Sequence, residues 1–268
     1  MTEESALRLG SFLVVLLVMN LWEWLAPRRP LIAQKSSRLF GNYLLAVLNT
    51  VVLRVATPIS AVAMAIICEE KQIGLFQAYH VPETVNVVLT VILLDLAIYG
   101  QHVLFHAVPL FWRIHRVHHA DLDLDVSSGL RFHTLEIVLS MAIKIGFVAL
   151  LGASALGVIL FEVILNATAM FNHSNVKLPL GLDNLLRKVI VTPDMHRVHH
   201  SVYRNETNSN YGFNLSCWDR LFRTYIAQPK DGHEGMQIGL SESRDEQTTN
   251  RLAGILKMPF AKSEDPME

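Results

Sequence analysis

The pentapeptide His115-Arg116-Val117-His118-His119 occurs twice in this chain, since the same five residues return as His196-Arg197-Val198-His199-His200. Residues three and four positions apart share one face of an α-helix. On a helix, each copy is therefore expected to direct its three imidazoles toward one point. Neutral imidazole is the commonest nitrogen ligand of iron, copper and zinc in proteins. The repeated pentapeptide thus predicts a helical fold built around a metal site.

A further pair of histidines stands just before the first pentapeptide. His102 and His106 are four residues apart, so they share a helix face as well. Together, the pair and the two pentapeptides hold eight of the 12 histidines in the chain. This is more than one tetrahedral ion can bind. The sequence therefore predicts a site for two metal ions.

The composition is typical of a membrane protein. Of the 268 residues, 51% are hydrophobic and only 18% are charged, and the mean hydropathy is +0.32. A soluble domain is usually less apolar. The formal net charge of -1 gives no indication of the basic surface that binds nucleic acid. Cys68 and Cys217 lack a metal-binding spacing and are expected to be packing residues.

Long apolar stretches predict four to five membrane-spanning helices. Residues 9–26 are long enough to cross ~30 Å of hydrocarbon, and Glu23 near their end is expected to face water. Residues 40–68 contain Pro58, which should kink or split the span, and Arg54, which should face the bundle interior or snorkel. Residues 85–105 form a third span. Residues 135–151 and 153–171 are joined so closely that they predict a membrane hairpin.

The topology gives an independent check on the two-metal prediction. The basic residues within 28–38 are expected in the cytoplasm by the positive-inside rule, which places the N-terminus outside. Counting spans from there, all three histidine clusters emerge on the cytoplasmic side. The predicted fold is an all-α, polytopic membrane helical bundle of four to five spans, with a cytoplasmic helical cap that carries the histidines.

Three regions are predicted along the chain. Residues 1–84 form N-terminal membrane spans and loops, residues 85–228 a catalytic domain, and residues 229–268 a polar C-terminal tail. The tail has many charges and few aromatic residues, so it is expected to be a loose appendage. His80 and His233 lie outside the clusters and are expected to be exposed loop residues.

Four polar residues are candidates for orienting the metal ligands: Asp95, Tyr99, Glu136 and Asn210. Asp95 and Tyr99 lie on the helical stripe of His102 and His106. A carboxylate inside a membrane span is costly and usually functional, and Asp95 could hold a ligating imidazole by hydrogen bonding. Asn210 could orient a histidine or a metal-bound water.

The all-histidine ligand set limits the chemistry. Neutral nitrogen ligands without thiolate fit Fe(II), Zn(II) or Cu better than Mg or Ca. An O₂-activating di-iron site in an apolar bundle is the first interpretation. A zinc-dependent membrane lipid amidase or hydrolase is the second, although such a site usually adds a carboxylate and a general base. A metal transporter or sensor is the weakest, because the ligands lie at one end of the spans.

The histidine spacing resembles that of the fatty acid hydroxylase superfamily. This superfamily includes sterol desaturases, C4-methylsterol oxidases, alkylglycerol monooxygenase and carotene hydroxylases. The resemblance covers residues 91–225. It is carried by the three histidine clusters together with Arg131-Phe132-His133-Thr134-Leu135-Glu136, Phe171-Asn172-His173-Ser174-Asn175, Asn210-Tyr211-Gly212 and Trp218-Asp219-Arg220-Leu221-Phe222-Arg223-Thr224-Tyr225.

The resemblance implies a cap that holds two irons and an O₂-dependent hydroxylation or desaturation of a lipid C–H bond. It implies His173 as a ninth ligand, and His133 as a tenth ligand or as a partner of Glu136. The full candidate ligand set is His102, His106, His115, His118, His119, His173, His196, His199, His200 and, least securely supported, His133.

The substrate class stays open among sterol, fatty acyl, ether lipid and carotenoid. No fused cytochrome or ferredoxin domain is visible, so a separate electron donor of ferredoxin, cytochrome or reductase type is expected. An integral protein of the bacterial inner membrane is favoured over one of the endoplasmic reticulum.

Overall fold

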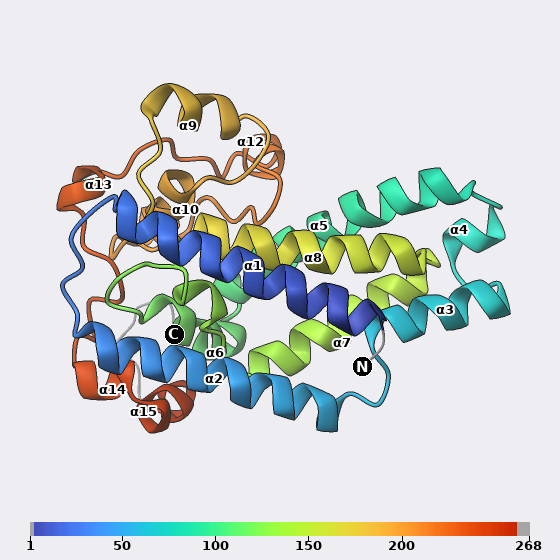
Figure 1. Ribbon diagram of the computed structural model, residues 1–268, viewed down its shortest axis with the longest axis horizontal. Helices are drawn as coiled ribbons and strands as arrows, with labels where there is room; N and C mark the ends of the chain where they lie inside the picture. The colour runs from blue at the N-terminus through green and yellow to red at the C-terminus, as the bar shows by residue number, and fades with distance from the viewer. Residues whose placement is uncertain (1–2, 262–268) are drawn as a thin grey trace.

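A computed structural model describes residues 3–261, whose regular secondary structure is almost entirely α-helical (Figure 1). The five long helices are α1 (Glu3–Leu25), α2 (Lys35–Ala56), α5 (Glu83–Ala107), α7 (Thr134–Leu151) and α8 (Ala155–Asn172). The shorter helices are α3 (Ala61–Lys71), α4 (Leu75–Ala78), α6 (Pro109–His119), η1 (Ser128–Leu130), α9 (Leu180–Leu186), α10 (Pro193–His199), α11 (Arg204–Thr207), α12 (Cys217–Leu221), α13 (Gly232–Gly235), α14 (Glu246–Asn250), α15 (Leu252–Lys257) and η2 (Met258–Phe260). Within the described residues, β-structure is limited to isolated bridges. The predicted all-α class is confirmed.

Five helical segments are long and apolar enough to cross a membrane: Ala6–Leu25, Lys35–Ala78, Glu83–Ala107, Thr134–Leu151 and Ala155–Asn172. Large apolar side chains such as Leu17, Val55 and Leu150 are exposed on their outer faces. Contiguous exposed apolar surface of this kind marks contact with lipid rather than water. The predicted polytopic bundle is therefore confirmed.

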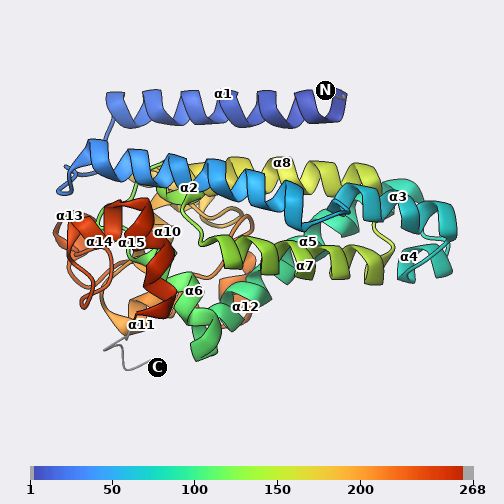
Figure 2. The ribbon, with the colours of Figure 1, turned by 90° about the horizontal axis from the view of Figure 1, so that it is seen from below.

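The second span is divided, as Pro58 predicted. Helix α2 ends at Ala56 and α3 begins at Ala61, because proline lacks a backbone N–H and disrupts helical hydrogen bonding. The side chain of Ser60 accepts a hydrogen bond from the backbone N–H of Ala63 and so caps the new helix. Helix α3 then lies at the end of the bundle opposite to the short C-terminal helices (Figures 1 and 2).

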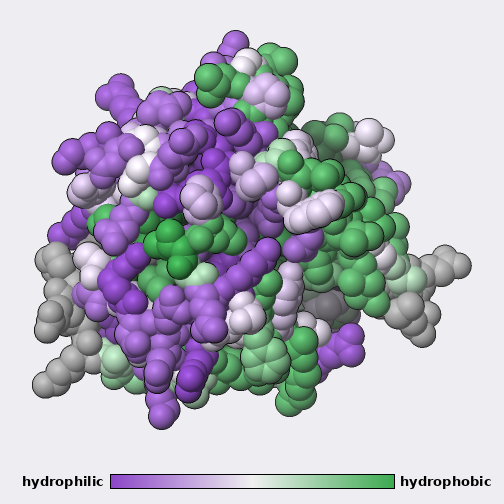
Figure 3. Space-filling view, turned by 60° about the vertical axis from the view of Figure 1, so that its left-hand side comes forward, coloured by the Kyte–Doolittle hydropathy of each residue, from purple (hydrophilic) through white to green (hydrophobic). Residues whose placement is uncertain are grey.

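Helices α6 and α9–α15 gather at the other end of the bundle, where α1 and α8 finish and α2 and α7 begin (Figures 1 and 2). We call this assembly the cap. Figure 3, which turns the cap end toward the viewer, shows hydrophilic residues gathered over it and hydrophobic residues along the flank of the bundle. The loop of residues 26–34 also lies at the cap end, as the span count predicted.

The loop after α1 is fastened to the cap by hydrogen bonds. Arg28 Nε lies 3.2 Å from the carboxylate of Asp194, and Arg29 donates to the carbonyl of Met236 at 2.7 Å. Glu23 was expected to face water, but its carboxylate is directed into the protein. Its Oε1 accepts hydrogen bonds from the backbone N–H groups of Val126 and Asn175, since those buried loop donors need an acceptor.

The expectation of a loose C-terminal appendage is wrong as far as residue 261. Leu240, Ile255 and Met258 join a buried cluster with Leu45 and Trp112. Helices α2 and α14 approach so closely that a Cβ added at Gly41 would lie 2.0 Å from the Asn250 carbonyl oxygen. A few buried apolar residues are enough to anchor this otherwise charged segment. Residues 262–268 lie outside the described part of the chain.

Candidate metal centre

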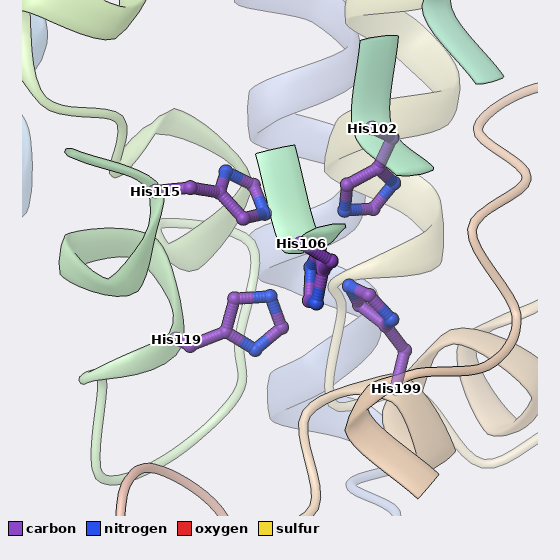
Figure 4. A group of neighbouring side chains, drawn as sticks. All are labelled: His102, His106, His115, His119 and His199. Atoms are coloured by element: carbon purple, nitrogen blue, oxygen red, sulfur yellow. The ribbon is translucent and has the colours of Figure 1, made fainter. Parts of the chain in front are cut away.

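Nine histidines converge at the junction between the bundle and the cap. They form a five-histidine group (His102, His106, His115, His119 and His199) and a four-histidine group (His118, His173, His196 and His200). Within each group, one ring nitrogen from each residue lies within 4.8 Å of all the others. Figure 4 shows the five-histidine group, with imidazoles from α5, α6 and α10 pointing toward one another. All nine side chains are buried.

Each pentapeptide divides its histidines between the two groups, which corrects the expectation that its three imidazoles meet at one point. His115 and His119 belong to the five-histidine group, whereas His118 belongs to the other. The second copy does the reverse, because His196 and His200 belong to the four-histidine group. A helix turns about 100° per residue, so positions i+3 and i+4 lie on opposite sides of position i.

The divided pentapeptides hold the two groups side by side. The rings of His119 and His200, one from each group, are stacked with centroids 4.6 Å apart. The His118 and His119 rings, adjacent in sequence, have centroids 5.4 Å apart. Two ions held by these groups would therefore be neighbours in one buried site.

The nitrogen separations in the four-histidine group fit a bound ion. The Nε2 atom of His173 lies 3.1 Å from that of His118 and 3.0 Å from that of His196. Two imidazole nitrogens that bind one ion at about 2.1 Å are about 3.0–3.4 Å apart at octahedral or tetrahedral angles. The separations are thus those of ligands around one metal.

The five-histidine group gives a second test. The Nε2 atoms of all its members are buried and have no hydrogen-bond partner among the described residues: His102, His106, His115, His119 and His199. Leaving so many buried polar atoms unsatisfied is costly. A metal ion that accepts these lone pairs removes the cost, so the residues fit a metal.

In six of the nine histidines, the opposite ring nitrogen is held by an oxygen acceptor. Residues 208–211, which follow α11, supply three of these acceptors: His102 Nδ1 lies 2.8 Å from the Tyr211 carbonyl, His199 Nδ1 2.7 Å from the Ser209 carbonyl, and His106 Nδ1 3.3 Å from Asn208 Oδ1. A carbonyl oxygen can only accept, so each Nδ1 carries the proton. The Nε2 lone pair is then left for a metal.

The other acceptors come from α7, from α8 and from the loop between α6 and α7. Glu136 Oε1 lies 2.7 Å from His115 Nδ1, and the Ala169 carbonyl lies 2.7 Å from His173 Nδ1. A Cβ at Gly129 would lie 2.6 Å from that same Ala169 oxygen. Only glycine therefore allows η1 to pack this closely against the helix end that orients His173.

The loop before α7 is built on buried charges. Asp121 Oδ2 accepts hydrogen bonds from Arg38, Asn42 and Ser128 at 3.0, 3.1 and 2.7 Å. Burial alone would raise the pKa of Asp121, but the charges of Arg38 and Arg131 hold that pKa below its usual value. The carbonyl of Arg131 in turn lies 3.2 Å from His118 Nδ1. This charge network therefore fixes the position of one ligand.

Burial keeps five of the clustered imidazoles neutral. It lowers the pKa of His173 to about 4 and that of His199 to about 3, and it lowers the pKa of His118, His196 and His200 well below their ordinary value. The cause is the loss of hydration of the charged ring. At neutral pH these nitrogens are free of protons and ready to bind a metal.

Asp95 and Tyr99 form hydrogen bonds to residues of the cap rather than to a histidine. Asp95 accepts hydrogen bonds from the backbone N–H of Asn214 and Leu215 and from Trp218 Nε1. The Tyr99 hydroxyl lies 2.9 Å from Thr224 Oγ1. Both side chains thus fasten α5 to the segment that contains the acceptors for His102 and His199.

Asn210 and His133, two further candidates, form hydrogen bonds to backbone groups instead of orienting a ligand. Asn210 donates to the carbonyls of Met195 and Ile226 and has φ = 50°, a left-handed conformation that asparagine tolerates; Asn208 carries the bond to His106. His133 belongs to neither group. Its Nδ1 accepts from the N–H of Leu135 and caps α7, and its Nε2 lies 3.3 Å from the Leu256 carbonyl.

His80 and His233, the two histidines outside the sequence clusters, differ from each other. His80 is exposed, as expected. His233 is buried, which contradicts the expectation of an exposed loop residue, and its Nε2 lies 3.5 Å from Asp194 Oδ2. Burial lowers the pKa of His233 to about 4 although the nearby aspartate opposes this. His233 packs α13 against α10 within the cap.

A cavity of about 580 Å³ lies among α1, α2, α5, α7 and α8 and reaches the five-histidine group. His102, His115 and Glu136 line its inner end together with Phe105 and Phe213. Small-molecule sites typically measure about 300–1,000 Å³. The cavity therefore gives a molecule inside the bundle access to the candidate metal site.

The match to known sequences follows the histidines. The sequence model described as fatty acid hydroxylase matches residues 87–224, just over half of the chain and all nine clustered histidines. The chain belongs to the fatty acid hydroxylase family. This confirms the resemblance drawn from the histidine spacing, over nearly the same residues.

Among curated members of this family, the chain is 32% identical over 149 residues to the ornithine lipid hydroxylase OlsE of Rhizobium tropici, a match that covers 56% of this chain and 44% of that protein. It is 30% identical over 135 residues to alkylglycerol monooxygenase of Homo sapiens, covering 50% of this chain and 29% of the relative. The chain thus spans less than half the length of the curated relatives it matches. No solved structure matches it significantly.

Proposed function

We propose that this family member is a di-iron oxygenase that hydroxylates a C–H bond of a lipid. The observation that carries the proposal is the pair of adjacent histidine groups, of which one opens into a cavity within the membrane-spanning helices. Imidazole ligands without thiolate suit redox-active iron. When bound, two irons supply the activation of O₂ and the transfer of one oxygen atom to carbon.

The overall reaction needs an electron source. One lipid C–H bond, O₂, two electrons and two protons give a C–OH group and one water molecule. The electrons come from a separate donor of ferredoxin, cytochrome or reductase type, which we expect to dock on the cap because the cap is the hydrophilic end of the molecule (Figure 3). We place the cap on the cytoplasmic side, since the basic residues within 28–38 lie at the cap end of the bundle.

The chain's own residues position the reactants. The aromatic rings of Phe105 and Phe213 line the cavity beside His102 and His115 and exclude water from the reacting carbon. Glu136 and the carbonyls of residues 208–211 hold the imidazoles in the tautomer that presents Nε2. The named relatives act on ornithine lipid and on alkylglycerol, which supports a lipid substrate with a polar group and favours hydroxylation over desaturation.

The test is incorporation of oxygen from isotopically labelled O₂. Purified iron-loaded protein is incubated with a membrane lipid extract, a chemical reductant and labelled O₂, and the lipids are analysed by mass spectrometry. We expect one labelled oxygen atom in a lipid product. His118→Ala and His199→Ala should abolish the product, whereas the exposed His80→Ala should not change it.

Two outcomes would overturn the proposal. The first is an iron-loaded protein that consumes no O₂ with any lipid and reductant. The second is zinc-supported release of a lipid fragment without O₂, which would establish the alternative of a zinc-dependent membrane lipid amidase or hydrolase.

A further inference from the structure

The end of the cavity remote from the histidines is lined by charged side chains. Arg8 of α1, Arg54 of α2, Lys144 of α7 and Glu162 of α8 all face this space. Charged residues inside membrane spans are costly and are usually kept for a function. Histidines at one end of the cavity and ionic groups at the other make it suited to an elongated, amphiphilic molecule.

Three of these residues form an ion cluster around one buried carboxylate. Glu162 is 4% exposed, and its Oε1 accepts a hydrogen bond from Lys144 Nζ at 2.7 Å while its Oε2 pairs with Arg8. Both carboxylate oxygens therefore have a partner already. The cluster joins α1, α7 and α8, which by itself would explain a purely structural role.

Arg54 lies outside that cluster. Its side chain is exposed and lines the same cavity, and no hydrogen bond or ion pair joins it to another residue within the described part of the chain. Among the described side chains that line it, the remote end thus carries three cations and one carboxylate. An ammonium has three N–H donors, and the described bond to Glu162 uses one of those on Lys144. Arg54 and the remaining donors of Lys144 can therefore bind an anion at this end.

The distance to the histidines follows from helix α7. Lys144 comes eight residues after Glu136, which bonds to His115, and eight residues of helix span about 12 Å. An extended hydrocarbon chain with C–C bonds of about 1.5 Å advances ~1.3 Å per carbon. The cationic end and the metal site are therefore separated by the length of about ten carbons.

We propose that Arg54 and Lys144 bind the anionic head group, carboxylate or phosphate, of the lipid substrate, and that this contact selects the carbon to be oxidised about ten positions away. The oxidation part rests on the proposed function, whereas the binding part does not. Arg54 and Lys144 are specificity-determining residues here, and they are not involved in the oxygen chemistry.

The binding part is tested on full-length protein loaded with zinc, which cannot reduce O₂. Hexadecanoate and hexadecyl phosphate are compared with uncharged 1-hexadecanol by displacement of a spin-labelled fatty acid in detergent micelles. We expect both anions to bind about tenfold more tightly than the alcohol, as charge-assisted hydrogen bonds would provide. The tighter anion of the two identifies carboxylate or phosphate as the natural head group.

Variants separate head-group binding from a structural role. Arg54→Gln and Lys144→Gln should each reduce the preference for the anions by about tenfold and leave 1-hexadecanol binding unchanged. Lys144→Arg should restore it, because the charge and donors are retained. Lys35→Gln, which removes an exposed charge at the cap end of α2, is the matched control. Glu162→Gln should retain or increase anion binding, since it frees the cations from their carboxylate.

Equal affinity for the anions and the alcohol, or an unchanged preference in Arg54→Gln, overturns the inference. So does tighter binding of hexadecylamine, a cationic chain of the same length. If the protein binds anions as expected but the iron-loaded form oxidises no lipid, the proposed function fails and the binding site stands. If both hold, fragmentation mass spectrometry should locate the new hydroxyl about ten carbons from the head group, and Arg54→Gln should scatter its position.

Discussion

Glu136 Oε1 lies 2.7 Å from His115 Nδ1, and both side chains are almost completely buried. The carboxylate comes from the first turn of α7 and the imidazole from α6, so the bond fixes a candidate ligand across two helices. A carboxylate that accepts a hydrogen bond from the outer nitrogen of a ligating imidazole orients the ring and strengthens its bond to a metal. Among the described residues, His115 is the member of its group that is held by a carboxylate.

Glu136→Ala should weaken metal binding by about 10–100-fold, the usual effect of losing such an outer partner. Glu136→Gln should have a smaller effect, because its amide oxygen can still accept from Nδ1. The measurement is metal retention during titration with a chelator. Glu70→Gln, at an exposed position, serves as the control. Equal retention in Glu136→Ala and the control would show that the contact does not tune the site.

Replacing one ligand in either histidine group should remove a single ion. His119→Ala acts on the five-histidine group and His196→Ala on the four-histidine group, and each should reduce the metal content from two ions to one per chain. The content is measured by elemental analysis of protein purified in detergent. A variant that loses both ions at once would indicate that the groups form one coupled site, and wild-type protein with one ion would contradict the two-metal proposal.

His133→Ala should leave the metal content unchanged. Both ring nitrogens of His133 are engaged elsewhere, since Nδ1 caps α7 and Nε2 lies beside the Leu256 carbonyl. The loss of a helix cap should instead reduce the free energy of unfolding by about 1 kcal/mol. Thermal unfolding and elemental analysis of the same sample check both parts. A reduced metal content would make His133 a ligand despite these contacts.

The sequence predicted the spans and the histidines that converge because both depend on residue type and spacing. The length of an apolar stretch determines whether it can cross a membrane. Pro58 divides its span whatever the helix packs against. The histidines are recognisable because few other roles require eight imidazoles in three clusters. These features are local, so they can be recognised without knowledge of tertiary contacts.

What the sequence did not predict depends on long-range contacts. The division of each pentapeptide between two groups follows from where α6 and α10 meet, although the i+3 and i+4 positions already point about 100° apart. The carbonyls of Ser209 and Tyr211 orient His199 and His102, but a backbone oxygen leaves no trace in residue type. Glu162 could have been noticed as a charge within an apolar helix.

The metal-free protein should lose stability as the pH falls from about 6.5 toward 4. Burial lowers the pKa of His173 to about 4 and that of His199 to about 3, from a value of 6.5. Between these values the unfolded chain binds protons that the folded chain does not, so acid favours unfolding. Melting temperatures of chelator-treated protein at several pH values test this. His173→Gln should flatten the slope, and a slope of opposite sign would contradict the assigned neutral rings.

Asp95→Asn should loosen the five-histidine group without touching a ligand. The Asp95 carboxylate holds the N–H groups of Asn214 and Leu215, and the nearby carboxylate of Asp219 holds those of Tyr211 and Gly212. An asparagine keeps one acceptor but presents an N–H₂ group to a donor, which should cost about 1–3 kcal/mol. The segment that presents the Tyr211 carbonyl to His102 then gains freedom.

We therefore expect Asp95→Asn to lower the affinity for one of two ions, with the second ion retained. Asp219→Asn should have the larger effect, because Asp219 binds the N–H of Tyr211 itself. Chelator titration with elemental analysis distinguishes a two-step from a one-step loss of metal. A general loss of folding would instead lower the melting temperature and release both ions together. Unchanged release from both variants would mean that the loop is held without its carboxylates, and that His102 is oriented by helix α5 alone.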